Sequence, residues 1–211
     1  GRGQKEVCIY LPWSMNTVIK DLILDDDATL IPVKPTKKLL CFGDSITQGM
    51  DCLHPSQTYS ARIADALGMA EYNKAIAGTT AFPGMAAVRE TFTPDVIVVA
   101  YGTNDWSRFC RLPEDAAAFY RTLRATYPNT PIVALAPVWR ADWQDHPDHT
   151  DFRLVAEGIS KIAEEVENVH FIDCFGFIPE DTALYSDLYL HPNDEGHALL
   201  AQRLLSVLES I

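Results

Sequence analysis

The chain has 211 residues, of which 47% are apolar and 22% charged, and its formal net charge is −12 at pH 7. This length can bury the core of one domain, and the composition is that of a globular protein. The acidic balance argues against nucleic acid as a partner, because nucleic acids bind basic surfaces. No apolar run reaches the ~18 residues of a membrane span.

Residues 1–37 differ from the rest of the chain. They contain three strand-like stretches, Val7–Leu11, Val18–Leu24 and Thr29–Val33. So few residues cannot form an independent core. We therefore expect a short N-terminal β extension packed on a main domain of residues 38–211. The printed sequence has no signal-peptide pattern, and it leaves open both the compartment, cytoplasmic or secreted, and the oligomeric state.

From Lys38 onward, short apolar runs alternate with helical patterns. The predicted strands are Leu39–Phe42, Glu71–Ala75, Val96–Ala100, Ile132–Ala136 and Val169–Ile172. The predicted helices are Thr58–Leu67, Met85–Phe92, Pro113–Tyr127, Thr150–Val166 and Asn193–Leu208. Such alternation predicts an α/β fold of three layers, α/β/α, with a five-stranded parallel sheet between the helices. Ligands bind such sheets at the carboxyl ends of the strands.

A small hydroxyl residue follows the first of these strands in the segment Gly43-Asp44-Ser45-Ile46-Thr47. A serine in a glycine-flanked turn after a strand can be an attacking nucleophile. The alternative role is a helix N-cap. A phosphate-binding loop, as for a flavin mononucleotide, is a weaker alternative because the segment lacks the Lys-Ser/Thr ending of a nucleotide-triphosphate loop.

Three later segments support the nucleophile interpretation. They are Ile76–Thr79, Tyr101–Asp105 and Asp187–Asn193. They provide Gly, Asn and His in that order. With these four segments, the chain resembles the SGNH or GDSL hydrolases from Lys38 to its C-terminus, and its last two segments look most like the bacterial carbohydrate-esterase-like branch. The resemblance implies a flavodoxin-like fold and an ester hydrolase that needs no metal or organic cofactor.

The resemblance assigns a role to each of three residues. Ser45 would attack the ester, His191 would take its proton, and Asp187 would orient His191. The family spacing is Asp-x-x-His, whereas Asp187 lies four residues before His191. We expect one extra residue in the turn. A Ser–His dyad assisted by a backbone carbonyl, or another acid, is the alternative.

The remaining site residues belong to the oxyanion hole and to the rim. The predicted oxyanion donors are the backbone amides of Ser45 and Gly78 and the side-chain amide of Asn104. Trp106, Trp139 and Arg140 are expected in loops at the predicted active rim, where they are candidates for substrate binding. His146 and His149 are interpreted as a polar loop because no further ligand has a matching spacing, so no metal site is predicted.

The predicted function is hydrolysis of short acyl esters, acetyl esters first, on small molecules or carbohydrates. The enzyme alternative is a lysophospholipase or thioesterase acting on longer acyl chains. Two other classes remain open. One is a carbohydrate-binding module with a decayed site, and the other is a binder of a phosphate-bearing cofactor.

Overall fold

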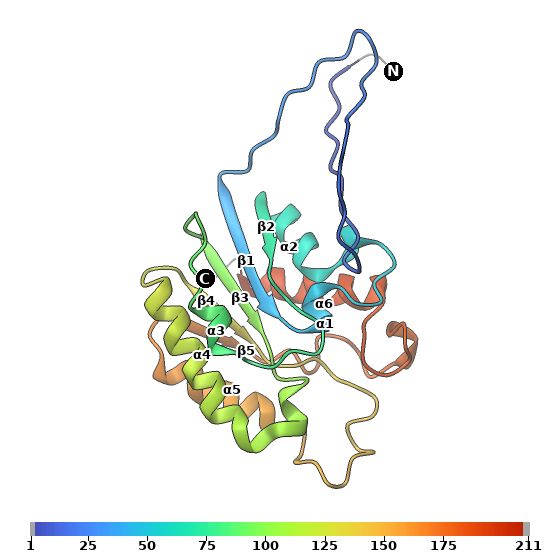
Figure 1. Ribbon diagram of the computed structural model, residues 1–211. Helices are drawn as coiled ribbons and strands as arrows, with labels where there is room; N and C mark the ends of the chain where they lie inside the picture. The colour runs from blue at the N-terminus through green and yellow to red at the C-terminus, as the bar shows by residue number, and fades with distance from the viewer. Residues whose placement is uncertain (1–2, 209–211) are drawn as a thin grey trace.

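Five parallel strands form one sheet in the computed structural model of this protein, which describes residues 3–208 and, within them, all side chains except those of 108–110. The strand order is β2-β1-β3-β4-β5 (Figure 1). The strands are β1 (Lys37–Gly43), β2 (Met69–Asn73), β3 (Val96–Ala100), β4 (Ile132–Leu135) and β5 (Val169–Ile172). The predicted α/β class and the parallel sheet are confirmed.

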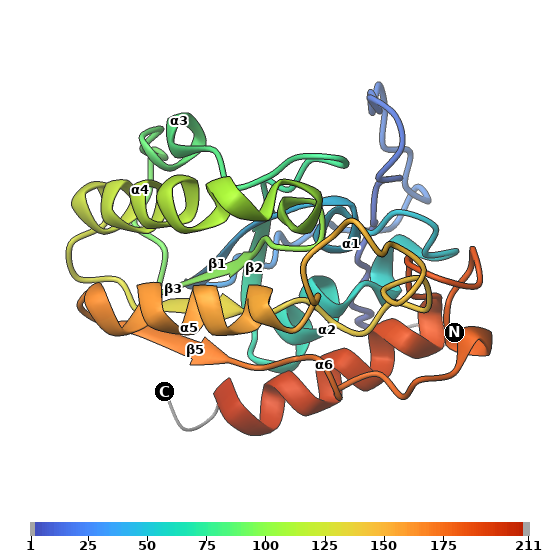
Figure 2. The same cartoon turned by 90° about the horizontal axis from the view of Figure 1, so that it is seen from below.

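Helices cover both faces of the sheet (Figure 2). They are α1 (Ser45–Gln48), α2 (Tyr59–Ala66), α3 (Pro83–Ala86), α4 (Leu112–Thr126), α5 (Leu154–Glu165) and α6 (Asp194–Leu208), with 3₁₀ turns at Pro55–Gln57, Asp105–Arg111 and Thr182–Leu184. Alternate residues of β1 enter different cores: Leu40 and Phe42 pack toward α4 and α5, whereas Leu39 and Cys41 pack toward α2 and α6. A strand buried on both faces needs such a continuous apolar run. Within residues 3–208, every helix is too short or too polar to cross a bilayer.

The sheet register brings two of the predicted site loops to one edge. Gly43 at the end of β1 pairs with Ala100 at the end of β3. The chain leaves β1 toward β2 and then returns to the opposite side of β1, so the carboxyl ends of β1 and β3 form a topological switch point. A Cβ on Gly43 would collide with the Thr47 side chain and lie 2.9 Å from the Ala100 carbonyl oxygen, so this turn requires glycine.

The helix predicted over Met85–Phe92 is wrong, because only the short α3, Pro83–Ala86, forms there. Tertiary contacts hold the following residues out of a helix. The Glu90 amide donates to the Tyr127 hydroxyl at 2.9 Å, and the Phe92 ring lies 4.1 Å from that of Tyr72. Strand β2 also begins two residues before its predicted start.

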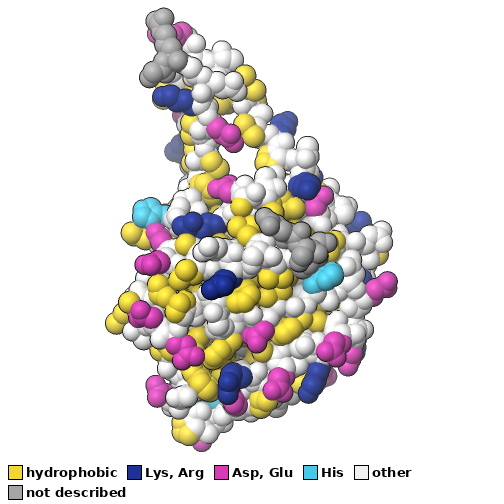
Figure 3. All heavy atoms as spheres, turned by 180° about the vertical axis from the view of Figure 1, so that it is seen from behind, with side chains coloured by type: hydrophobic (Ala, Val, Ile, Leu, Met, Phe, Trp, Pro, Cys, Tyr) yellow, Lys and Arg dark blue, Asp and Glu magenta, His cyan; other side chains and the backbone are white. Residues whose placement is uncertain are grey.

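Residues 3–36, here called the N-terminal arm, contain no strand or helix, so the three strands predicted there are wrong. From a start away from the main domain, the arm runs to it, extends away again and then returns to enter β1 (Figure 1). Its apolar side chains reach solvent (Figure 3), among them Val7, Ile9, Val18, Ile23, Ile31 and Val33. No described strand pairs with these stretches. The arm contacts the main domain through Tyr10, which donates to Asp65, and Trp13, which donates to the Cys52 carbonyl oxygen. The division between the β extension and the main domain at residue 37 stays a prediction.

Candidate active site

Ser45 is the first residue of α1 and follows β1 after one turn residue. Asp44 caps this helix, and its Oδ1 accepts the Ile46 amide at 3.1 Å. The amide of Ser45 lies in the first turn, where helix geometry provides no internal acceptor for an N–H group. The local sequence therefore buries the Ser45 side chain at the carboxyl edge of the sheet and leaves its amide directed out of the helix start.

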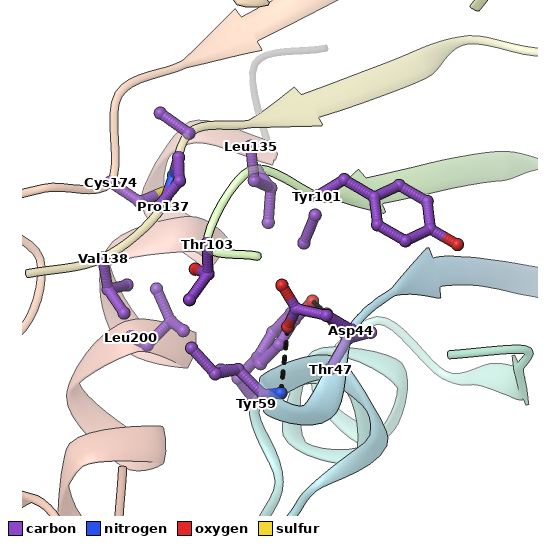
Figure 4. Close-up of a pocket in the computed structure, with 13 residues that line it drawn as sticks. Asp44, Thr47, Tyr59, Tyr101, Thr103, Leu135, Pro137, Val138, Cys174 and Leu200 are labelled. Atoms are coloured by element: carbon purple, nitrogen blue, oxygen red, sulfur yellow. Dashed lines mark hydrogen bonds between the residues drawn. The ribbon is translucent and has the colours of Figure 1, made fainter. Parts of the chain in front are cut away.

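A small cavity lies behind this turn, and Asp44 points into it (Figure 4). Its walls are mostly apolar and include Leu135, Val138 and Leu200. Burial among them, opposed by the Ile46 amide and aided by nearby Asp105, raises the pKa of Asp44 to about 7. Asp44 thus acts as a buried support for Ser45.

Three predicted side chains meet in one hydrogen-bonded line. His191 Nε2 lies 2.9 Å from Ser45 Oγ, and His191 Nδ1 lies 2.7 Å from Asp187 Oδ2. Ser45 and His191 are buried although 146 residues separate them. This arrangement provides a hydroxyl, a base that can take its proton, and a carboxylate that can orient the base.

The turn from Asp187 to His191 contains the extra residue expected from the sequence. Leu188 adopts a left-handed backbone with φ of 67°. Asp187 Oδ1 then accepts the amides of Tyr189, Leu190 and His191 at 2.8–3.1 Å. Burial opposes ionisation of Asp187, but these amides and the His191 ring together lower its pKa. Asp187 is therefore a carboxylate at neutral pH.

The predicted oxyanion donors Gly78 and Asn104 lie on loops that are tied to the Ser45 turn. Asn104 Nδ2 donates to the Thr79 carbonyl oxygen at 3.0 Å, and the Ile76 amide donates to the Gly43 carbonyl oxygen at 3.1 Å. Gly78 has φ of 74°, a conformation that glycine adopts without strain. Each Asn amide has two hydrogens, so Asn104 retains one for a ligand.

A hollow of about 460 Å³ opens beside Gly78 and Asn104. Its lining residues are Ile76, Gly78, Thr79, Thr80, Phe82, Met85, Tyr101, Asn104 and Ser107, and none of these described residues is charged. The Phe82 side chain is 60% exposed there. A Cβ on Gly84 would lie 2.5 Å from the Phe82 ring, so the ring rests on the glycine backbone. Phe82 is not among the residues predicted from the sequence, because its only local signal is its position before Pro83-Gly84.

Of the three rim residues expected to bind substrate, the two tryptophans are buried and Arg140 is partly buried. Trp106 is 2% exposed and its indole donates to the Thr150 carbonyl oxygen at 2.6 Å. Trp139 is 7% exposed and packs against Tyr185. Arg140 forms an ion pair with Asp142 and lies over the Trp106 ring. The two indole rings pack into the core, and none of the three residues lines the hollow beside Asn104.

The described side chains do not support a metal site at the two loop histidines. His146 and His149 stack on each other with ring centroids 4.9 Å apart, and both contact Trp106. Among described residues, the one group with clustered ligand atoms is Asp51, Asp187 and His191, within 4.8 Å of one another. Its histidine nitrogen already faces Asp187, so this group belongs to the hydrogen-bonded line. The start of α1, where a cofactor phosphate would bind, carries the Asp44 carboxylate.

Solved structures of related fold include esterases and an acyltransferase. The chain is 27% identical to the salicylyl-acyltransferase of a tetracycline biosynthetic pathway, with a TM-score of 0.72 over 85% of this chain and 57% of that one. A family two carbohydrate esterase from Clostridium thermocellum, solved with cellohexaose, is 20% identical, with a TM-score of 0.68 over 86% of this chain and 66% of that one. A carbohydrate esterase family 2 enzyme from Corynascus thermopiles is 19% identical, with a TM-score of 0.68, 87% of this chain and 69% of that one being covered.

The chain thus spans little more than half of the acyltransferase and two thirds of the clostridial esterase. Among curated protein sequences, none matches it significantly. The model of the GDSL-like lipase/acylhydrolase family matches residues 41–199, a range that begins in β1 and ends in α6. This match covers most of the main domain, including Ser45 and His191, and so the chain belongs to the GDSL-like lipase/acylhydrolase family of ester hydrolases.

Proposed function

We propose that this chain hydrolyses esters through an acyl-enzyme on Ser45. The observation that carries the proposal is the unbroken hydrogen-bonded line from Ser45 through His191 to Asp187. His191 removes the hydroxyl proton as Ser45 Oγ bonds to the ester carbon, and the carbonyl electron pair moves to its oxygen. The amides of Ser45 and Gly78 and the side chain of Asn104 stabilise that oxyanion.

The intermediate then breaks the bond to the alcohol oxygen, which receives the proton from His191. In the second half, His191 takes a proton from water while the water oxygen attacks the acyl carbon. Ser45 Oγ leaves and recovers its proton from His191, which releases the carboxylic acid. Asp187 stabilises the positive imidazolium in both halves.

The proposed substrates are short acyl esters, above all acetyl groups on carbohydrates. The uncharged hollow beside Gly78 and Asn104 supports a neutral ligand, and the exposed Phe82 ring offers a face on which a sugar ring can pack. A hollow of this size also admits a longer acyl chain, which keeps the lysophospholipase or thioesterase as the second candidate.

The first test compares the acyl and the alcohol parts of the substrate separately. We expect aryl esters to be cleaved with kcat/KM highest for acetyl and falling from butyryl to decanoyl, and acetylated glycosides to release acetate. A kcat/KM that rises with chain length would select the second candidate. Turnover of none of these esters, together with retained glycan binding, would favour a decayed binding module.

Replacing Phe82 by alanine tests the ligand face. We expect KM for an acetylated glycoside to rise about 2–12-fold, because an aromatic contact contributes roughly 0.5–1.5 kcal/mol, with kcat changed less than about twofold. The matched control is Val88→Ala, which truncates an exposed side chain beyond α3 that does not line the hollow. Equal KM values for the two variants would remove Phe82 from the ligand site.

A further inference from the structure

Two carboxylates, not one, face the same nitrogen of His191. Asp187 Oδ2 lies 2.7 Å from His191 Nδ1, and Asp51 Oδ2 lies 3.5 Å from it. The longer distance exceeds that of a hydrogen bond, so Asp187 holds the proton of Nδ1 and Asp51 stands beside it. The two acids come from different loops, Asp51 after α1 and Asp187 before α6. Either one can therefore be substituted while the other stays in place.

The backbone holds Asp51 in this position. Its φ of 64° is left-handed, a conformation in which Asp and Asn are enriched among residues other than glycine. The Ser186 hydroxyl donates to the Asp51 carbonyl oxygen at 2.7 Å, which ties it to the residue before Asp187. On the other side, Asp194 of α6 accepts the Leu53 amide at 2.8 Å. The loop that carries Asp51 is thus fixed to the loop that carries Asp187 and to α6.

The charges around His191 are unequal. Asp187 is ionised and its side chain is 19% exposed, whereas that of Asp51 is 38% exposed. From α6, His197 also faces this region, but burial lowers its pKa to about 4, so it is neutral at pH 7. Two carboxylates therefore lie beside the imidazole nitrogen where the ring becomes positive during the reaction.

We propose that Asp51 is a second positioning residue for His191. It stabilises the imidazolium together with Asp187. When the Asp187 carboxylate is absent, Asp51 accepts the hydrogen bond from the N–H group at Nδ1. This inference rests on the proposed function, because it assumes that His191 is the base for Ser45. Asp51 touches neither Ser45 nor a substrate and acts only through His191.

A double-mutant cycle measures this coupling. We expect Asp187→Asn to lower kcat about 10²-fold, which is less than the ~10⁴-fold that the loss of a sole triad acid costs. Asp51→Asn alone should lower kcat about threefold. The double variant should fall by about 10⁴-fold, because no acid then faces Nδ1 and effects of residues in contact are not additive. If Asp51→Asn costs the same threefold in both backgrounds, the two acids do not act together and the inference is wrong.

The pKa of the His191 imidazolium gives a reading that does not need activity. When the ring is titrated by NMR in the Ser45→Ala background, Asp51→Asn should make it lose its proton at a lower pH than in the parent protein, because a nearby carboxylate favours the protonated ring. The control Asp148→Asn removes the charge of an exposed acid elsewhere and should leave it unchanged. An unchanged value in both variants would overturn the role of Asp51.

Backbone strain is excluded by a second substitution. Asp51→Gly accepts the left-handed backbone and removes the carboxylate, so it should reproduce the effects of Asp51→Asn. If only one of the two variants changes kcat, the cause is local folding and the inference fails. Activity that survives Ser45→Ala would instead contradict the proposed function, and the NMR titration still decides the role of Asp51.

Discussion

Replacing Ser45 by alanine is expected to lower kcat for aryl acetate hydrolysis by about 10⁶-fold, because nucleophile and base act as one unit in serine hydrolases. The substitution removes one oxygen from a buried site, and alanine suits the first turn of α1. Folding should therefore be unaffected. Steady-state kinetics measure the loss, and a thermal melt verifies the fold.

The control is Ser206→Ala, which removes an exposed hydroxyl from α6 and is prepared in parallel. It should retain the full rate, so that a contaminating esterase is recognised. A fluorophosphonate should also form an adduct on Ser45, located by mass spectrometry, and should not label the Ser45→Ala variant. A rate in Ser45→Ala above about one per cent of that of the unchanged protein would remove Ser45 as the nucleophile.

Replacing Asn104 by alanine is expected to lower kcat about 10²–10³-fold, since the loss of one oxyanion donor costs roughly 3–4 kcal/mol in the transition state. KM should change little, because the ground-state carbonyl carries less charge than the oxyanion. The variant also loses the hydrogen bond to Thr79, at a cost of about 1 kcal/mol in the free energy of unfolding.

A second substitution, which also removes both donors, tests the sign of the charge at this position. Asn104→Asp keeps the size of the side chain but replaces the donor by a negative charge, so kcat should fall at least as far as in Asn104→Ala. Denaturant titration of both variants reports the change in stability. A kcat within about threefold of the unchanged protein in Asn104→Ala would place the third donor elsewhere.

Much of the central architecture follows from local sequence. The apolar run of β1 is buried on both faces, and the turn after it requires glycine at position 43 because the Thr47 side chain approaches it closely. These are properties of adjacent residues, and they predicted where Ser45 would lie. The contact between Ser45 and His191 was predicted from the order of the motifs along the chain, because a parallel sheet brings the carboxyl ends of its strands to one edge.

Other features depend on contacts that no local pattern contains. The Met85–Phe92 helix fails because Tyr127 and Tyr72 hold the segment from distant elements. Trp106 was expected in an exposed loop, but it is buried, and its indole donates to the carbonyl oxygen of Thr150, 44 positions away. Asp51 was missed because its only signal, a turn after Gly49, says nothing about a histidine 140 positions later. Contacts between residues far apart in the sequence could therefore be assigned only from the three-dimensional structure.

The left-handed turn at Leu188 has a consequence for recognising such enzymes. Its backbone absorbs one inserted position and still returns the carboxylate of Asp187 to the ring of His191. A pattern that fixes the interval between these two residues would therefore reject a protein whose geometry is intact. Searches for members of this family will be more complete if they score the distance between the acid and the imidazole in space and let the interval vary.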